Sequence, residues 1–297
     1  MTGGWFALAG ATPVPSKTND QGSIIVNRLA LGLLALVAYL LSVQNIPAPK
    51  TIAAETQTTR HFITNLDGSK APKRLGFDVF DINSGKWAVH ALPKGVKGLV
   101  YLGQNCPTLA DRSFKSTVRS LASSRKVYGY YLSDEPHIAD CPRGPAALAS
   151  RADFIRRVTD GKQRSFIVLS EKKDYRPFRP ARTHVDLVGI NPYPCSIANP
   201  NCDVSKIGDR VRAARRAEIP LRKIVPVYQA FGQENVADHY YNLPTPKQQR
   251  RMFAVWSRLV PTPQMDYTYC WGNQNSSSPT LIDSPALQDV FAKRFLR

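Results

Sequence analysis

From residue 75 onward the sequence alternates short apolar or aromatic runs with longer amphipathic stretches, and this alternation restricts the possible folds most strongly. Strands separated by helices predict a parallel sheet with right-handed crossover connections. The seven expected strands are Leu75–Phe80, Val96–Leu102, Val127–Ser133, Ser165–Leu169, Val185–Ile190, Lys223–Tyr228 and Tyr267–Trp271. The expected helices are Asp111–Ser123, Ala146–Thr159, Lys206–Ala217, Pro246–Leu259 and one that begins at Ser284-Pro285.

An eighth strand completes the count for a closed barrel. His61–Leu66 could supply the first strand, and eight strands with intervening helices predict a (β/α)8 TIM-type barrel. The alternative is an open, doubly wound sheet. The nucleotide-binding version of that sheet is disfavoured, because no G-x-G-x-x-G follows the first strand and no Walker sequence is present.

The stretch Lys126–Pro136, K-V-Y-G-Y-Y-L-S-D-E-P, ends a strand with two adjacent carboxylates. Val and Tyr favour a half-buried strand, and Pro136 ends it because proline cannot donate to a strand ladder. Asp134 and Glu135 therefore fall where the strand ends, and acids there are typical of enzyme sites at the carboxyl edge of a sheet. The alternative interpretation is a strand followed by an acidic surface turn.

Other expected strand ends also carry carboxylates, amides and aromatic rings. They are Asp78, Asp81, Gln104, Asn105, Glu171, Asn191, Tyr193, Tyr228, Gln229, Glu234, Trp271, Asn273 and Gln274. Carboxylates and amides hydrogen-bond hydroxyl groups, and rings stack on the apolar faces of sugars, so this set predicts a site for a polyhydroxylated ligand. The order of a Ser-His-Asp triad and the G-x-S-x-G elbow are both missing from the sequence.

The net charge of +18, from 40 basic and 22 acidic side chains, favours an anionic neighbour. The basic residues are dispersed and no zinc-finger or RNA-binding signature is present, so we expect no nucleic-acid partner. A polysaccharide or oligosaccharide partner is expected instead, and the charge favours an acidic one.

The amino-terminal part contains the one strongly hydrophobic segment, Leu29–Val43, which directly follows Arg28. Its length is between that of a signal-peptide core and that of a membrane span. We divide the chain into a tail (1–25, or an over-extended start), a signal peptide or membrane anchor (26–45), a linker (46–70) and the barrel (71–297). Either reading of the segment predicts export to the periplasm or the exterior, with tethering to the inner membrane if the segment is uncleaved.

The five cysteines also favour an oxidising compartment. Cys195 and Cys202 bracket a loop rich in Pro and Asn that a disulfide would close, and Cys106 and Cys141 each follow an expected strand end. Cys270 is left over in an aromatic strand and is expected to be buried. The alternative is five unrelated thiols. Because no Cys or His spacing fits a zinc site, we expect neither a metal nor a cofactor.

Four segments resemble the secreted (β/α)8 glycoside-hydrolase-like proteins: Y-Y-L-S-D-E-P, D-L-V-G-I-N-P-Y-P-C, V-P-V-Y-Q-A-F-G and the aromatic strand with Trp271. The resemblance covers Leu75–Arg297 and is closest to the clan of retaining glycosidases whose acid/base glutamate lies in an Asn-Glu-Pro turn after strand four. It implies that Glu135 is the general acid/base and that Trp271 lies under the sugar at the cleavage point.

The sequence departs from that pattern at two places. Asp134 replaces the usual asparagine, and Tyr228-Gln229 occupies the end of strand seven, where the nucleophilic glutamate is expected. The nearest acid there is Glu234. Retaining chemistry needs two carboxyls ~5–5.5 Å apart and inverting chemistry ~6.5–9.5 Å.

The sequence therefore predicts a glycoside hydrolase acting on an extracytoplasmic polysaccharide. Its catalytic residues would be Glu135 with Glu234, Asp134 or Asp78 as partner, and its substrate-binding residues would be Asp78, Asn191, Tyr193, Tyr228, Gln229, Trp271 and Asn273. The alternative is a non-catalytic protein on the same barrel that binds carbohydrate or assists surface-polysaccharide assembly. An open-sheet enzyme of another class would leave the row of amides and rings unexplained.

Overall fold

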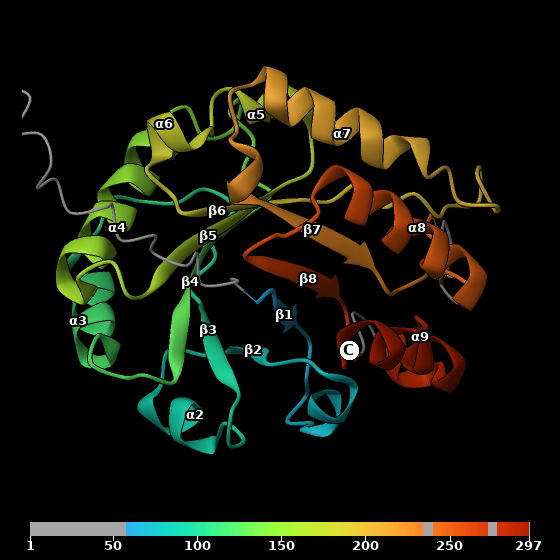
Figure 1. Cartoon of the computed structure of the whole chain (residues 1–297). Coiled ribbons are helices and arrows are strands. Elements are labelled where there is room, and N and C mark those ends of the chain that lie inside the picture. The colour runs from blue at the N-terminus through green and yellow to red at the C-terminus, as the bar shows by residue number, and fades with distance from the viewer. Residues whose placement is uncertain (1–57, 234–239, 273–277, 297) are drawn as a thin grey trace, which may run out of the picture. The chain divides into compact units, whose positions relative to one another are not determined.

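A computed structural model describes residues 58–233, 240–272 and 278–296. They form a closed barrel of eight parallel strands arranged in chain order, in which β8 pairs with β1 (Figure 1). The strands are β1 (Arg60–Ile63), β2 (Val79–Ile82), β3 (Lys97–Tyr101), β4 (Val127–Asp134), β5 (Arg164–Leu169), β6 (Leu187–Ile190), β7 (Ile224–Gln229) and β8 (Met265–Tyr269). The predicted TIM-type barrel is confirmed, and the open sheet is excluded.

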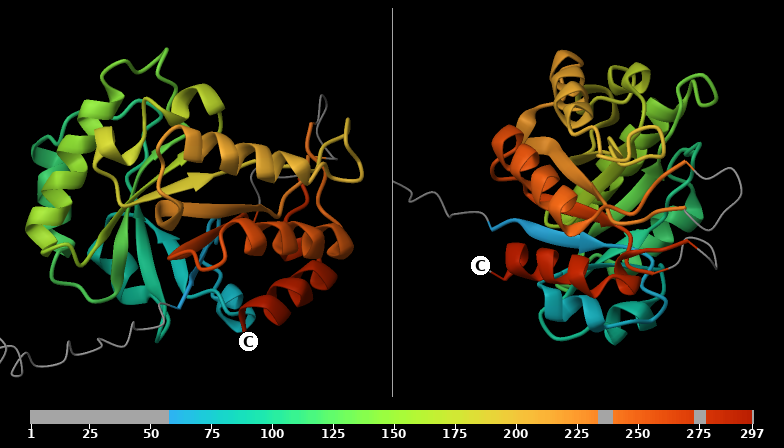
Figure 2. Two further views of the ribbon diagram at one scale, coloured as in Figure 1. Left: turned by 45° about the horizontal axis from the view of Figure 1, so that its top comes forward. Right: turned by 90° about the vertical axis from the view of Figure 1, so that its right-hand side faces the viewer.

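Helices surround the strands on the outside of the barrel (Figures 1 and 2). They are α2 (Lys86–Ala91), α3 (Arg112–Leu121), α4 (Gly144–Thr159), α5 (Lys172–Tyr175), α6 (Pro180–Thr183), α7 (Ser205–Arg216), α8 (Pro246–Leu259) and α9 (Pro285–Phe295). Short 3-10 turns are η2 (Ala71–Leu75), η3 (Leu221–Lys223) and η4 (Leu281–Asp283). The expected start of α9 is confirmed, because Ser284 accepts a hydrogen bond from the Leu287 amide and Pro285 occupies the first turn.

Side chains fill the structure in two layers. Inside the barrel, the rings of Phe62, Tyr131, Phe166 and Tyr267 contact one another, with the centroids of Phe62 and Tyr267 4.7 Å apart. A second, larger set of apolar residues lies between the strands and the helices. Because the barrel interior is packed with rings, a ligand has to bind beyond the ends of the strands, in the loops.

Two strands have bounds that differ from the predicted ones in a way that moves a predicted site residue. β2 starts at Val79, because Ala71–Leu75 forms a 3-10 turn that ends at Gly76 with φ +95°. A side chain at Gly76 would also meet the Cβ of Phe295 at 2.7 Å. β8 ends at Tyr269, two residues before the predicted end at Trp271. These two shifts decide where Asp78 and Trp271 lie.

The first strand, expected within His61–Leu66, is confirmed as β1, which pairs with both β2 and β8. It lies within the range assigned to a linker (46–70), so the barrel includes residues before 71. The expected tail and hydrophobic segment, 1–25 and 26–45, lie outside the described residues. Within the described ranges, no helix has both the length and the apolar character needed to cross a membrane.

Candidate active site

The end of β4 carries the two carboxylates that the sequence singled out. Asp134 is the last residue of the strand, and Glu135 turns the chain away with φ +48°. A residue other than glycine in this left-handed region is uncommon and is found preferentially at functional sites. The Glu135 amide donates to the carbonyl of Val168 on β5 at 3.1 Å. The backbone of Glu135 is therefore anchored to the sheet at the carboxyl end of the barrel.

The Glu135 side chain is held by neutral hydrogen-bond donors. Asn191 lies in the loop after β6, and its side-chain amide donates a hydrogen bond to Oε1 of Glu135. Burial raises the pKa of the Glu135 carboxyl above its ordinary value of 4.5 and the charge of Asp134 raises it further, whereas hydrogen bonds from Asn191 and Ser170 oppose the shift. Glu135 consequently keeps its proton to a higher pH than an exposed glutamate, which is the property required of a general acid.

Asp134 has a different partner. The hydroxyl of Tyr131, which stands on β4 inside the barrel, donates to Oδ1 of Asp134 at 2.6 Å. Burial raises the pKa of Asp134, and the hydrogen bond from Tyr131 opposes that effect. Asp134 therefore adds a second carboxylate beside Glu135, fixed by a phenol that is itself packed against Phe62 and Phe166.

A pocket of about 500 Å³ opens above these carboxylates at the carboxyl end of the barrel. Aromatic side chains form much of its wall, and Tyr193 makes edge contacts with Phe231 at 5.0 Å and with Tyr241 at 5.6 Å between ring centroids. The lining residues are Asp134, Glu135, His137, Val168, Ser170, Glu171, Asn191, Pro192, Tyr193, Arg210, Phe231, Gln233, Tyr241, Tyr267 and Tyr269. Carboxylates, amides and rings in one cavity suit a sugar ligand.

The structure brings five residues of the predicted strand-end set together in this pocket: Asp134, Glu135, Glu171, Asn191 and Tyr193. Glu234 and Asn273 lie outside the described residues.

The predicted role of Asp78, as a ligand residue or as the partner of Glu135, is wrong. Asp78 precedes β2 and so lies at the amino end of the barrel, opposite the pocket. Its carboxylate pairs with Arg60 at 2.5 Å and accepts a hydrogen bond from the His61 amide at 2.8 Å.

Three further predicted ligand contacts are also corrected, because the side chains are buried away from the pocket. Trp271 follows β8 and is 1% exposed in the outer core. Tyr228 packs on Phe253, and its hydroxyl lies 3.4 Å from Oδ2 of Asp266. Gln229 is fully buried, and its side chain both donates to the carbonyl of Cys195 and accepts from the Cys195 amide at 2.9 Å.

Several pocket residues were missed from the sequence. Tyr269, the last residue of β8, lines the pocket, whereas Trp271, two residues later and expected to lie under the sugar, does not. Tyr241 and Arg210 also line the pocket, and Arg210 comes from α7, where the pattern R-V-R-A-A-R-R reads as a solvated helix face. Of these three residues, only Tyr269 could have been identified from the sequence, because it stands in the aromatic run at the end of β8.

Two disulfides brace the loops around the site, as predicted. Cys106 bonds to Cys141 and Cys195 bonds to Cys202, while Cys270 is free and buried. Five unrelated thiols are therefore excluded. Cys106 follows β3 and Cys141 follows β4, so this bond joins the two loops that flank Asp134 and Glu135.

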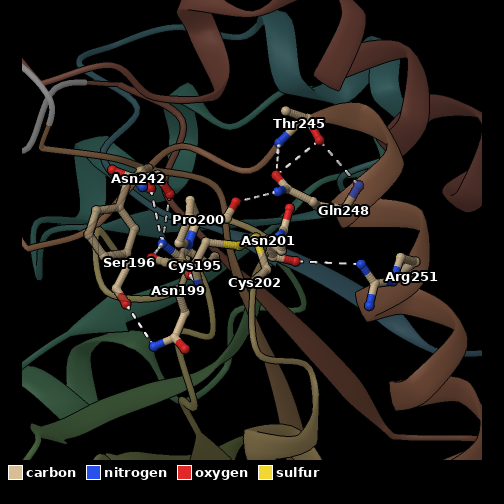
Figure 3. The surroundings of a disulfide bond; sticks show 12 residues. Cys195, Ser196, Asn199, Pro200, Asn201, Cys202, Asn242, Thr245, Gln248 and Arg251 are labelled. Carbon is tan, nitrogen blue, oxygen red and sulfur yellow. Dashed lines mark hydrogen bonds between the residues drawn. A yellow bond between two sulfur atoms is a disulfide. The ribbon is translucent and has the colours of Figure 1, made fainter.

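The loop closed by Cys195 and Cys202 is also fastened to α8 (Figure 3). The Gln248 side chain donates to the carbonyl of Pro200 at 2.7 Å, and Arg251 donates to that of Asn201 at 3.5 Å. Because Cys195 follows Tyr193 by two residues, these contacts hold the loop that carries Asn191 and Tyr193 into the pocket.

One group beside the pocket has the residue types of a metal site. His137, Glu171 and Asp174 present ligand atoms within 4.8 Å of one another. These groups already have partners in the protein: Nδ1 of His137 lies 2.8 Å from Asp174, the Ile138 amide donates to Asp174 at 2.8 Å, and Lys173 pairs with Glu171 at 2.8 Å. We assign no metal to them, and the expectation that the site works without a metal or cofactor stays a prediction.

Comparison with known proteins finds a likeness of fold. No protein-family model and no curated protein sequence matches the chain.

Solved structures do match it. The GH18 chitinase ChiB from Flavobacterium johnsoniae has 10% identity and a TM-score of 0.50, over 80% of this chain and 94% of that one. A GH128 endo-β-1,3-glucanase from Amycolatopsis mediterranei, in complex with laminaritriose, has 10% identity and a TM-score of 0.53, over 79% and 99%. A β-glucuronidase from Ruminococcus gnavus, in complex with D-glucuronic acid, has 10% identity and a TM-score of 0.54, over 81% and 49%. The chain thus has the eight-stranded barrel fold of glycoside hydrolases of several specificities.

Proposed function

We propose that this protein is a glycoside hydrolase that acts on a polysaccharide outside the cytoplasm, with Glu135 as its general acid. The observation that carries the proposal is the position of Glu135, which is anchored at the carboxyl end of β4, faces a pocket of about 500 Å³ and has a pKa raised by burial. The barrel shared with chitinase, glucanase and glucuronidase supports the same reaction class, since active sites of this fold lie at that end.

In the proposed reaction Glu135 gives its proton to the glycosidic oxygen as the bond from that oxygen to the anomeric carbon breaks. The anomeric carbon, which becomes positively charged, bonds either to a second carboxylate that water later displaces, or to a water molecule from which a second carboxylate takes a proton. Asp134 is the described candidate, held by Tyr131, and Glu234 is the candidate from the loop after β7. Asn191 keeps the Glu135 carboxyl aimed at the bond to be cleaved.

Hydrolysis of a panel of reducing-end-labelled glycans by the Glu135→Gln variant tests the proposal. We expect the rate of product release to fall about a thousandfold, which is the usual contribution of a positioned general acid. Glu218→Gln is the matched control, because Glu218 pairs with Arg176 and Arg179 outside the pocket. Equal rates in the Glu135→Gln variant and the unmutated protein would exclude Glu135 as the acid.

Asp134→Asn and Glu234→Gln identify the second carboxylate. The variant that loses activity while it retains glycan binding names the partner of Glu135. If both retain full activity, the two-carboxylate mechanism fails.

A second candidate function is carbohydrate binding without cleavage, as in a surface-polysaccharide assembly protein. It is favoured by Gln229, because the end of β7 carries a fully buried amide that braces Cys195 where retaining enzymes are expected to place a nucleophilic glutamate. An unmutated protein that binds the glycans and releases no product from any of them would establish this function in place of hydrolysis.

We also propose that the protein is exported. Two disulfides in the barrel and the apolar run Leu29–Val43 support this location. Cell fractionation with non-reducing peptide mapping tests it. The expected result is a periplasmic, membrane-bound or secreted protein with both disulfides formed, and a cytoplasmic protein with reduced cysteines would contradict it.

A further inference from the structure

A second, basic pocket of about 270 Å³ adjoins the candidate active site. α7 supplies Lys206 and Arg210, which are four residues apart and therefore face the same side of the helix. Lys172, the first residue of α5, adds a third cation. The remaining lining residues are Pro192, Tyr193, Asp209, Tyr240 and Tyr241.

The two pockets are neighbours with a common wall. Arg210, Pro192, Tyr193 and Tyr241 line both of them. A chain of linked sugars with one ring beside Glu135 can therefore extend along this common wall into the basic pocket.

Two of the three cations of this pocket, Lys172 and Lys206, are available to a ligand, while Arg210 also contacts the Tyr175 hydroxyl. Among the described residues, the ammonium groups of Lys172 and Lys206 have no carboxylate at ion-pair distance. The one acidic residue in the wall, Asp209, is already paired with Arg212 at 2.5 Å. The pocket consequently carries an excess of positive charge next to three tyrosine rings, and such a site favours an anionic ligand.

We propose that this basic pocket binds an anionic sugar ring, one bearing a carboxylate or a sulfate ester, that adjoins the ring processed at Glu135. Lys206 and Arg210 bind the anionic group, and Tyr240, which is 53% exposed, offers a ring face to the sugar. This inference rests on the proposed function for the position of the neighbouring ring, but the binding of the anionic ring itself does not require cleavage.

Calorimetric titration of the full chain at physiological salt tests the proposal with two matched pairs of probes. Polygalacturonate is compared with its methyl ester, and dextran sulfate is compared with dextran. We expect the polyanion that carries the correct group to bind and its neutral counterpart to bind much more weakly. The Lys206→Gln variant should bind that polyanion about fivefold more weakly, the effect of one partly exposed ion pair.

Arg125→Gln is the control for general charge. Arg125 is an exposed cation in the turn before β4, at the amino end of the barrel, and its loss changes the net charge by the same amount. Equal weakening by Arg125→Gln and Lys206→Gln would overturn the proposal, because binding would then follow the net charge of +18. Equal binding of charged and neutral probes, or no binding of either polyanion, would overturn it too.

The outcome is separable from that of the proposed function. If polyanion binding depends on Lys206 but no glycan is cleaved, the anionic site stands and the hydrolase fails. If neutral glycans are cleaved with Glu135 and Lys206→Gln changes nothing, the hydrolase stands and the anionic site fails.

Discussion

The carboxylates of Asp78 and Asp266, at the amino end of the barrel, have other kinds of partner than the two carboxylates at the end of β4. At the amino end, Asp78 pairs with Arg60, and buried Asp266 lies 3.0 Å from Nδ1 of His61. At the carboxyl end, the hydrogen-bond partners of Glu135 and Asp134 are an amide and a phenol, which carry no charge. A cation balances the carboxylate charge and fixes it as part of the structure, whereas a neutral donor orients the group and leaves its protonation free to change.

The surroundings of the His61–Asp266 pair agree with a structural role. The imidazole of His61 stacks on Phe295 with ring centroids 3.8 Å apart, which ties β1 and β8 to the last helix. Burial acts to lower the pKa of His61, but the charge of Asp266 and the hydrogen bond to it outweigh burial and raise that pKa. Stability from the protonated imidazole is thus fully present below its unfolded pKa and is lost as the pH rises through the folded value.

The largest effect on stability should come from breaking this pair. His61→Ala leaves the carboxylate of Asp266 buried without its cation, so we expect the free energy of unfolding to fall by about 3 kcal/mol. Urea denaturation at pH 6 measures it. The control is His184→Ala, whose pair with Asp153 is nearly half exposed on both sides and should contribute under about 1 kcal/mol. Equal losses in the two variants would show that the burial of the His61–Asp266 pair does not increase its contribution to stability.

Asp81 extends the comparison, because it is a carboxyl-end acid that forms no ion pair with a described residue. Among the described residues its buried Oδ1 has no hydrogen-bond partner, and burial raises its pKa to about 6. Since folding disfavours the ionised form, stability should fall as the pH rises from the unfolded value toward 6 and then level off. We therefore expect Asp81→Asn to stabilise the protein by about 1–2 kcal/mol at pH 8 and by almost nothing at pH 4. A loss of stability at pH 8 would show that the charge of Asp81 is compensated.

A smaller effect is expected from Asn191, on the pH dependence of activity. The Asn191 amide favours the ionised form of Glu135, so its removal should raise the Glu135 pKa and keep the acid protonated to higher pH. For Asn191→Ala we expect the alkaline limb of the pH–rate profile to move to higher pH. A limb that moves downward or stays in place would mean that Asn191 does not hydrogen-bond the ionised carboxylate.

Local sequence was sufficient for the centre of the site and insufficient for its edges. Glu135 and Asn191 follow strands whose apolar runs end at a nearby proline, so their positions at the carboxyl end could be read from neighbouring residues. Asp78 could not be placed, because the start of β2 depends on the 3-10 turn Ala71–Leu75 and on the packing of Gly76 against Phe295. The apolar run that includes Leu75 gave no sign of that turn.

The other errors have the same origin in tertiary contacts. Trp271 and Tyr269 stand in one aromatic run, and only the pairing of β8 with β7 and β1 decides which ring reaches the pocket. Gln229 was predicted to contact a ligand. Its side-chain amide instead forms hydrogen bonds with the backbone of Cys195 and Asn242. Arg210 lies on α7, and it lines the pocket because of the way this helix packs on the barrel. The local sequence does not determine that packing.

The protonation of Glu135 is the most direct test of the difference between the two ends. Its side-chain carboxyl carbon can be followed by ¹³C NMR across a pH titration of the unmutated protein, with the resonance assigned by its loss in Glu135→Gln. We predict a pKa above the ordinary value of 4.5, as expected for a buried acid with neutral donors. A pKa at or below 4.5 would contradict the account, because Glu135 would then be a charge-compensated carboxylate like those at the amino end.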